Sequence, residues 1–334
     1  MKIFHRKLLG PKLLLALVPA SLVLASCGTE DLEAAKSFGA LSQGLAAANQ
    51  TISADIYGSC TRAATWKSWG HQGNRDIMYK NLKNCDSQYR TNAVNTEIAG
   101  SVLVNYVRAI GNLATEDEQG FTVQFNAISE ALGTLNIDGV TINENARKAG
   151  VQVANFIANF LVRDFRRDNL KSAIVCTDPD IQAYAANLSA FIDSSYVKFL
   201  LNKEIETINE NFAFYIIDSN EKRRSLEQKE RAEINKVIKR KNQGAAYVTA
   251  IRSTADFHNK LKQIFNNNQD GLSPELVRNC NQYRSDNENL NVQNNDVTED
   301  SWDLQISASE LKQIQNVSKE YIAQITPLLA QIQE

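Results

Sequence analysis

Five cysteines have the widest range of possible chemistry in this chain of 334 residues. They are Cys27, Cys60, Cys85, Cys176 and Cys280. Thiolates hold metals or exchange electrons most readily when they are closely spaced, as in Cys-x-x-Cys. No such pair exists in the sequence. The spacing therefore argues against a metal or redox site.

The motifs of the common catalytic sites are missing as well. The sequence contains no H-E-x-x-H, no G-x-S-x-G, no P-loop and no G-x-G-x-x-G. Its three histidines, His5, His71 and His258, are too few for a zinc cage or a histidine relay. A pair of catalytic carboxylates is not excluded, because Asp and Glu are plentiful and the two members of such a pair can be far apart in the sequence. We expect a protein that is not an enzyme and that uses no cofactor or metal.

Aromatic residues could form a partner site between the second and third cysteines. We expect a turn between Cys60 and Cys85 that contains Trp66, Trp69 and His71. Aromatic side chains with a nearby arginine are typical of binding hot spots. The alternative is that Trp66 continues an apolar stripe and closes the end of a bundle. Trp69 and His71 are the residues that we expect to be exposed.

A basic stretch is the second candidate contact surface. Residues 221–241 contain nine Lys and Arg residues against four Glu residues. Arg223, Arg224 and Lys229 are the candidate contacts within it. Such a patch could bind lipid phosphate, peptidoglycan or an acidic protein. The alternative is a solvated helix face close to a hairpin turn.

The first 28 residues have the parts of a bacterial export signal. A basic head is followed by an apolar run that is too short and too interrupted to span a bilayer comfortably. The segment Leu24-Ala25-Ser26-Cys27 then resembles the lipobox of bacterial lipoprotein precursors. The resemblance implies a diacylglyceryl group on the Cys27 sulfur, removal of residues 1–26 and acylation of the new amine. By analogy with the sorting of enterobacterial lipoproteins, Gly28 after the cysteine implies the outer membrane and not the inner one. The alternative is an ordinary secretory signal, with Cys27 as the first structural cysteine.

Removal of the signal makes the chain more acidic. The full sequence carries 36 Lys and Arg residues against 38 Asp and Glu residues. Loss of the four bases in residues 1–26 leaves 32 against 38, a net charge of −6. A mature protein with this net charge has no overall electrostatic attraction to nucleic acid. We expect an envelope protein or another cell-envelope component as the partner, besides the membrane that holds the lipid.

The four remaining cysteines predict two disulfides, for which three connectivities exist. Cys60 and Cys176 are each followed by Thr, and each closes a helical pattern. Cys85 and Cys280 are each preceded by Asn and followed by Gln-Tyr-Arg, with a spacing that differs by one residue. This echo favours Cys60–Cys85 and Cys176–Cys280, as in a divergent repeat.

Helices must position all of these residues. Apolar residues recur every three or four positions, which is the stripe of an amphipathic helix. Examples are Leu41, Leu45, Ala48, Ile52 and Ile56, and later Tyr247, Ile251, Thr254, His258 and Leu261. No convincing alternating strand of five residues exists. The sequence predicts an all-α protein, an elongated bundle of long antiparallel helices that forms one domain over residues 27–334.

Proline, glycine and clusters of polar residues suggest where the helices begin and end. Pro179 after Asp178 is typical of a first helical turn. A hairpin turn is expected near Ser219, and Gly244 is the alternative helix end. Residues 284–300 are rich in Asn, Asp and Glu and read as a loop. Pro327 should kink the last helix near its end.

The sequence thus predicts a lipid-anchored, non-catalytic helical protein of the bacterial envelope that binds or scaffolds. Two alternatives come from other classes. One is a helical toxin-like or membrane-inserting protein, which would need an apolar hairpin. The other is a cell-wall hydrolase or its activator, in which one dominant acid beside a cleft is expected.

Overall fold

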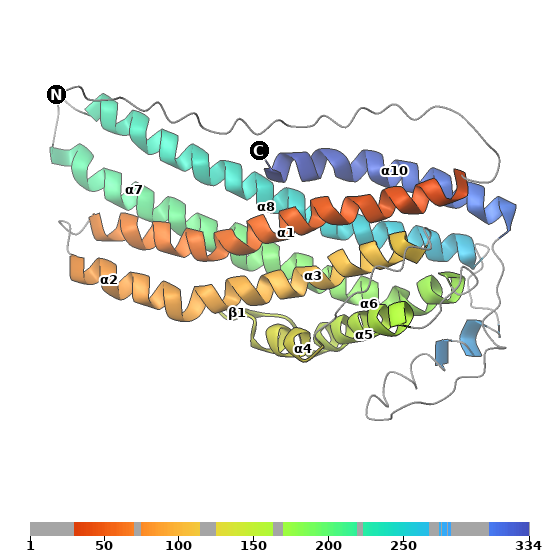
Figure 1. Ribbon diagram of the computed structural model, residues 1–334. Coiled ribbons are helices and arrows are strands. Elements are labelled where there is room, and N and C mark those ends of the chain that lie inside the picture. The colour runs from red at the N-terminus through yellow and green to blue at the C-terminus, as the bar shows by residue number, and fades with distance from the viewer. Residues whose placement is uncertain are drawn as a thin grey trace, which may run out of the picture.

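The structure is an elongated bundle of long helices (Figure 1). The computed structural model describes residues 30–69, 75–113, 125–162, 170–218, 223–266, 274, 276–278, 280–281 and 307–333. Almost all of these residues are helical, which confirms the all-α prediction. The longest helix has 43 residues, so it is roughly 65 Å long at 1.5 Å per residue.

The main elements follow one another along the chain with two π-helical insertions. The α-helices are α1 (Glu30–Trp69), α2 (Arg75–Asn84), α3 (Arg90–Leu113), α4 (Phe125–Thr134), α5 (Glu144–Val162), α6 (Leu170–Phe191), α7 (Leu201–Asp218), α8 (Arg223–Phe265) and α10 (Ala308–Gln333). The π-helical segment η1 (Cys85–Tyr89) joins α2 to α3, and η3 (Ile192–Leu200) joins α6 to α7. Both insertions leave a long helix continuous.

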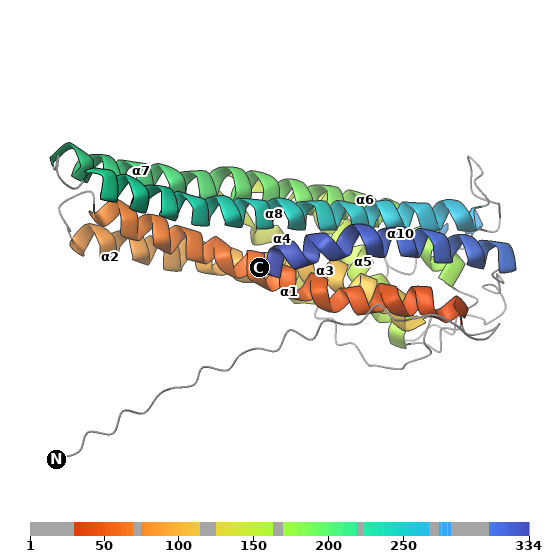
Figure 2. The same cartoon turned by 90° about the horizontal axis from the view of Figure 1, so that it is seen from above.

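The long helices lie side by side along the bundle. Helix α1 packs along α3, α10 and α7, while α8 packs along α10, α6 and α7. Figures 1 and 2 show that α7 and α8 run in opposite directions, and that the last turns of α1 and α7 lie at the same end of the molecule as the first turns of α2 and α8. Helix α10 occupies the other half of the bundle. Each long helix is therefore packed along its apolar stripe.

The core residues are those of the predicted stripes. Leu45, Ala48, Ile52 and Ile56 of α1 are buried, as are the five residues named above for α8. Small residues allow close approach between helices. A Cβ atom at Gly100 of α3 would lie 1.9 Å from the Asn49 side-chain oxygen of α1. Substitution of Gly100 would therefore displace the Asn49 side chain or force these two helices apart.

The hairpin turn falls where the first alternative put it. Helix α7 ends at Asp218 and α8 begins at Arg223, so the connection spans residues 219–222. Gly244 lies inside α8, and the alternative that it ends a helix is wrong. A Cβ atom there would come within 2.7 Å of Val197 Cγ2 in η3. The glycine is thus required by the close contact between α8 and η3.

The predicted disulfide pairing is confirmed. Cys60 is joined to Cys85, and Cys176 to Cys280. The prediction that Cys60 and Cys176 close helices is wrong, because they lie inside α1 and α6. Pro179 likewise lies within α6 and not in a first turn. Buried residues just before it, Ile174, Val175 and Cys176, hold this part of the helix by packing, which outweighs the backbone hydrogen bond that proline cannot make.

A small β-hairpin interrupts the helices between α4 and α5. Strand β1 (Asn136–Ile137) pairs antiparallel with β2 (Val140–Thr141). Asp138 and Gly139 form its turn, with φ angles of 52° and 81°. Two positive φ values are typical of a type I′ turn, for which Asp-Gly is a preferred sequence. The hairpin places Asp138 beside the helices of the cavity described below.

Several expectations concern residues outside the described ranges. The signal segment, Cys27, Gly28, His71 and the Asn-rich segment 284–300 belong to this group. In the described part of the chain, no helix combines the length and the apolar character that a membrane span requires.

Candidate functional site

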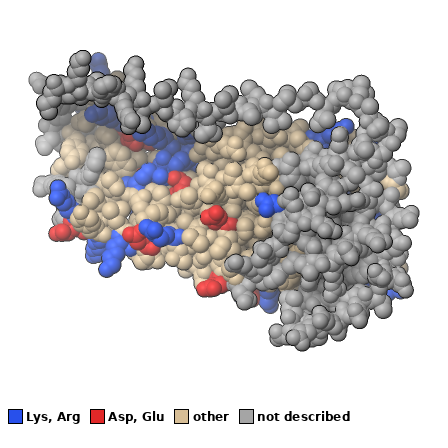
Figure 3. Space-filling model, in the orientation of Figure 1, with Lys and Arg blue, Asp and Glu red and all other residues tan. Residues whose placement is uncertain are grey.

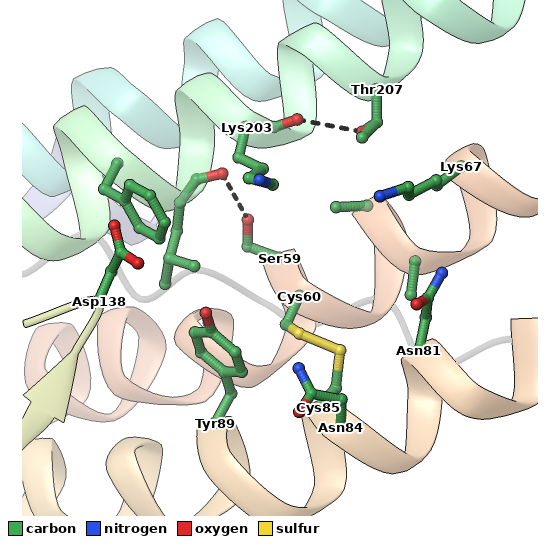
Figure 4. A pocket seen from close by; sticks show the side chains of 14 residues that line it. Ser59, Cys60, Lys67, Asn81, Asn84, Cys85, Tyr89, Asp138, Lys203 and Thr207 are labelled. Carbon is green, nitrogen blue, oxygen red and sulfur yellow. Dashed lines mark hydrogen bonds between the residues drawn. A yellow bond between two sulfur atoms is a disulfide. The ribbon is translucent and has the colours of Figure 1, made fainter. Parts of the chain in front are cut away.

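A cavity of about 260 Å³ lies between α1, η1 and α7. The last third of α1 lines it from Ser59 to Lys67, and α2 with η1 lines it from Asn81 to Tyr89 (Figure 4). Residues of η3 and α7 form the facing wall. The turn residue Asp138 approaches from the β-hairpin. Four separate parts of the chain therefore meet at this cavity.

Both π-helical segments contribute walls to the cavity. Cys85 and Tyr89 come from η1, and Phe199 and Leu200 come from η3 or its end. A π-helix is wider than an α-helix and bonds each N–H five residues back, as the N–H of Arg90 does to the Cys85 carbonyl. Such segments are rare, and they occur often at functional sites. Two of them around one cavity mark it as the leading candidate site.

The cavity has one apolar wall and one group of hydrogen-bond donors. The Cys60–Cys85 disulfide, Phe199 and Leu200 supply the apolar part. Figure 4 shows the Lys67 and Lys203 amines pointing into the space between α1 and α7. Asn81 lies next to Lys67, and its buried Nδ2 has no hydrogen-bond partner.

Asp138 and Tyr89 lie on the other side. Figure 4 places Asp138 away from Lys67 and Asn81, across the width of the cavity. Burial, together with the Asp138 carboxylate, raises the pKa of the Tyr89 phenol. Tyr89 is therefore neutral at physiological pH and can donate a hydrogen bond.

A buried ion network supports the cavity from behind. Glu204 of α7 is 1% exposed. It accepts a hydrogen bond from the Ser59 hydroxyl at 2.9 Å and one from Arg62 Nε at 2.8 Å, and it is also paired with Arg240 of α8. One carboxylate thus ties three long helices together directly behind the cavity wall.

A second carboxylate completes this network. Asp55 of α1 accepts a hydrogen bond from Arg62 Nη2 at 2.6 Å and one from the Tyr196 hydroxyl at 2.7 Å. Burial opposes the charge of Arg62, but Glu204 and Asp55 outweigh it and raise the pKa of the guanidinium. Burial and Asp55 raise the pKa of Tyr196 well above its ordinary value. The charges are matched, so the network is a structural support.

A second buried polar cluster crosses the core away from the cavity. The Tyr106 hydroxyl is 2.5 Å from His258 Nδ1, and His258 Nε2 is 3.6 Å from an Asp178 oxygen. Lys262 pairs with the other Asp178 oxygen at 2.7 Å. A tyrosine, a histidine and an aspartate in this order could relay a proton. His258 is only 1% exposed, however, and no residue of the cluster lines the cavity.

The stability of the protein should fall in mild acid because of His258. Burial lowers the pKa of His258 to about 4; Asp178 and the Ile174 backbone oppose the shift, and Lys262 adds to it. In the unfolded chain the pKa is about 6.5. Between these values the unfolded state binds a proton that the folded state does not. The free energy of unfolding should therefore drop by about 3 kcal/mol between pH 6.5 and 4, measured by urea unfolding at several pH values.

The matched variant for this test is His258→Gln, whose side chain can still bond to Tyr106 but does not titrate. Its free energy of unfolding should change about 3 kcal/mol less than that of the natural chain over the same pH range. Burial opposes the charge of Glu310, but its bonds to Ser307 and Lys171 outweigh burial and lower its pKa; its contribution to the pH dependence is the same in both proteins and cancels in the comparison. An identical pH dependence in the two proteins would contradict the assignment to His258.

Of the aromatic residues that were predicted to bind a partner, the structure places Trp66 against the core and does not describe the others fully. Trp66 is half-buried against the core, and its ring centre is 5.7 Å from that of Phe212, in agreement with the core alternative. Trp69 is the last residue of α1, so no turn begins at Cys60. The side chain of Trp69 and the whole of His71 lie outside the described residues.

The basic stretch lies at the end of the molecule where α7 meets α8. Figure 3 shows Lys and Arg side chains gathered over this end. Arg223, Arg224 and Lys229 are exposed, and Arg223 pairs with Glu227 at 3.1 Å. Arg240, at the other end of the stretch, is not a surface contact, because it belongs to the buried network around Glu204.

Sequence reasoning missed the cavity. Asp138 had a signal, since Asp-Gly between apolar residues is typical of a hairpin turn. Lys67 and Lys203 had none, because nothing in their local sequence relates two positions so far apart.

Compared with protein-family models, curated proteins and solved structures, the chain matches none. Among the described residues, no three His, Cys, Asp or Glu side chains are grouped as a metal site would need.

Proposed function

We propose that this protein is an exported, lipid-anchored binding module of the bacterial envelope and that it has no catalytic activity of its own. The lipid is attached to Cys27, and the helical body stands outside the cytoplasm. Binding uses the end of the bundle that contains the cavity and the exposed basic residues of α8. Arg223, Arg224 and Lys229 orient an acidic partner there.

The observation that supports export most strongly is the disulfide pairing. The four cysteines after the signal segment form two disulfides, and Cys27 stands outside both pairs. Disulfides persist in oxidising compartments such as the periplasm and the cell surface. An exported chain with one cysteine left over, directly after Leu-Ala-Ser, is what lipid attachment requires.

The chemistry of the described side chains supports binding over catalysis. The Tyr106–His258–Asp178 cluster is sealed in the core. The cavity, by contrast, carries lysines and amides, which hold a ligand by charge and hydrogen bonds. Lysines beside an apolar wall make a recognition surface.

Lipid attachment can be measured by growth with radiolabelled palmitate. The natural chain should be labelled and should be recovered with the membranes. Cys27→Ala should lose the label, because only a thiol forms the thioether. Ser26→Ala is the matched control, since it keeps a small residue before the cysteine and should still be labelled. A natural chain that is unlabelled and recovered in the soluble fraction would refute the anchor.

A further inference from the structure

We infer that the cavity between α1, η1 and α7 binds a small organic anion, in which a carboxylate or phosphate group is joined to an apolar body. This inference rests on the binding function proposed above and names the class of its ligand. It does not depend on the lipid. The cavity and its lining residues belong entirely to the folded part of the chain.

The amines of Lys67 and Lys203 supply the charge. They come from two facing helices and point into one space (Figure 4). Neither amine has an ion-pair partner within the described ranges, whereas Lys171, Lys260 and Lys262 have carboxylates at 2.9, 3.1 and 2.7 Å. Two like charges that converge without an anion repel each other. A ligand with a negative group would relieve this repulsion.

Asn81 lines the same end of the cavity, next to Lys67. Its Nδ2 is buried below the cavity surface and has no hydrogen-bond partner among the described residues, so a ligand contacts it only if the side chain turns. The two ammonium groups are donors only. The group that satisfies them must be rich in acceptor oxygens, as carboxylates and phosphates are.

The apolar wall requires more than an inorganic ion. Phe199, Leu200 and the Cys60–Cys85 disulfide line the space beside the donors. A bare phosphate would leave this wall in contact with water, whereas an apolar group would cover it. The volume of about 260 Å³ equals roughly nine water molecules at about 30 Å³ each. A substituted benzene ring with one anionic group is of suitable size.

Asp138 sets the direction of the ligand. It lies across the cavity from Lys67 and Asn81, beside Tyr89. A negative charge at that side would be repelled by the carboxylate. The anionic group therefore faces the lysines, and the uncharged body faces the disulfide and Phe199.

Phenyl phosphate and benzoate are the probes, and they separate the two kinds of anionic group. Inorganic phosphate lacks the apolar body, and benzyl alcohol lacks the charge. The full chain, purified in detergent, is titrated with each compound by calorimetry at constant ionic strength. At least one of the two aromatic anions should bind saturably and about tenfold more tightly than inorganic phosphate or benzyl alcohol. Only an aromatic anion contacts both the lysine amines and the apolar wall.

Substitution of the lysines locates the binding. Lys67→Met and Lys203→Met should each weaken binding of the aromatic anion about fivefold, the value of one charge contact at a solvated site. Lys260→Met is the matched control. It makes the same change at an exposed lysine outside the cavity, and should leave binding unchanged. Both cavity lysines are exposed, so the helical circular dichroism of the variants should equal that of the natural chain.

Three results would overturn the inference. The first is that neither aromatic anion binds saturably at millimolar concentration. The second is that inorganic phosphate binds as tightly as phenyl phosphate. The third is that a folded variant with both Lys67→Met and Lys203→Met keeps full affinity. Each result is independent of palmitate labelling. Failure of the anion site is thereby distinguished from failure of the lipid anchor.

Discussion

Removal of the Cys176–Cys280 disulfide should lower the free energy of unfolding by about 4–5 kcal/mol. The bond closes a loop over a sequence separation of 104 residues, and a longer closed loop removes more conformational freedom from the unfolded chain. The double variant Cys176→Ala with Cys280→Ala is the form to measure, because it leaves no free thiol at the site. Urea unfolding followed by circular dichroism gives the difference.

The second disulfide supplies the matched comparison. Cys60 and Cys85 are separated by only 25 residues, so the variant with both replaced by Ala should lose about 1 kcal/mol less. Both variants remove two sulfur atoms from helical positions, which makes the loss of packing similar. If the two variants lose equal free energy of unfolding, or if the Cys60–Cys85 variant loses more, then loop length is not the main source of the stabilisation.

Replacement of Glu204 by Ala should destabilise the protein by about 3–5 kcal/mol. Glu204 is the carboxylate that Arg62 and Arg240 share, and its side chain is 1% exposed. Without it, two guanidinium groups in partly buried positions keep, among the described residues, only Asp55 as an acidic partner. A buried charge that loses its partner cannot recover its hydration, so the folded state bears the cost.

Glu206 is the control for this variant. It lies on the same helix two residues away, it is exposed, and Glu206→Ala should change the free energy of unfolding by less than about 0.5 kcal/mol. The two variants have the same change of charge and of helix propensity. A Glu204→Ala protein as stable as Glu206→Ala would mean that solvent already satisfies the two arginines.

The helices and the core could be predicted because they depend on local patterns. The stripe Leu41, Leu45, Ala48, Ile52 and Ile56 follows the period of an α-helix; Leu41 is partly buried and the other four residues are buried. The disulfide pairing could be predicted from the repeated residues around Cys85 and Cys280. This prediction was correct although its premise, that Cys60 and Cys176 end helices, was wrong.

Local patterns failed where packing between distant segments decides the structure. Pro179 and Gly244 are common at helix ends, yet both lie inside helices because neighbouring elements hold those turns. The cavity depends on Lys67 and Lys203, which are 136 residues apart in the sequence. No periodicity or motif relates such positions. Only the path of α1 beside α7 brings them together.

The position of the cavity along α1 has a consequence for capture at a surface. The helix begins at Glu30, three residues after Cys27, and the cavity lies 29 to 37 residues further along. At 1.5 Å per residue this is roughly 45–55 Å. If Cys27 sits in a bilayer, Gly28 and Thr29 form a leash of only about 7 Å. The distance of the site from its anchor is then nearly fixed, so a target farther from Cys27 than this distance plus the tether has an effective concentration close to zero.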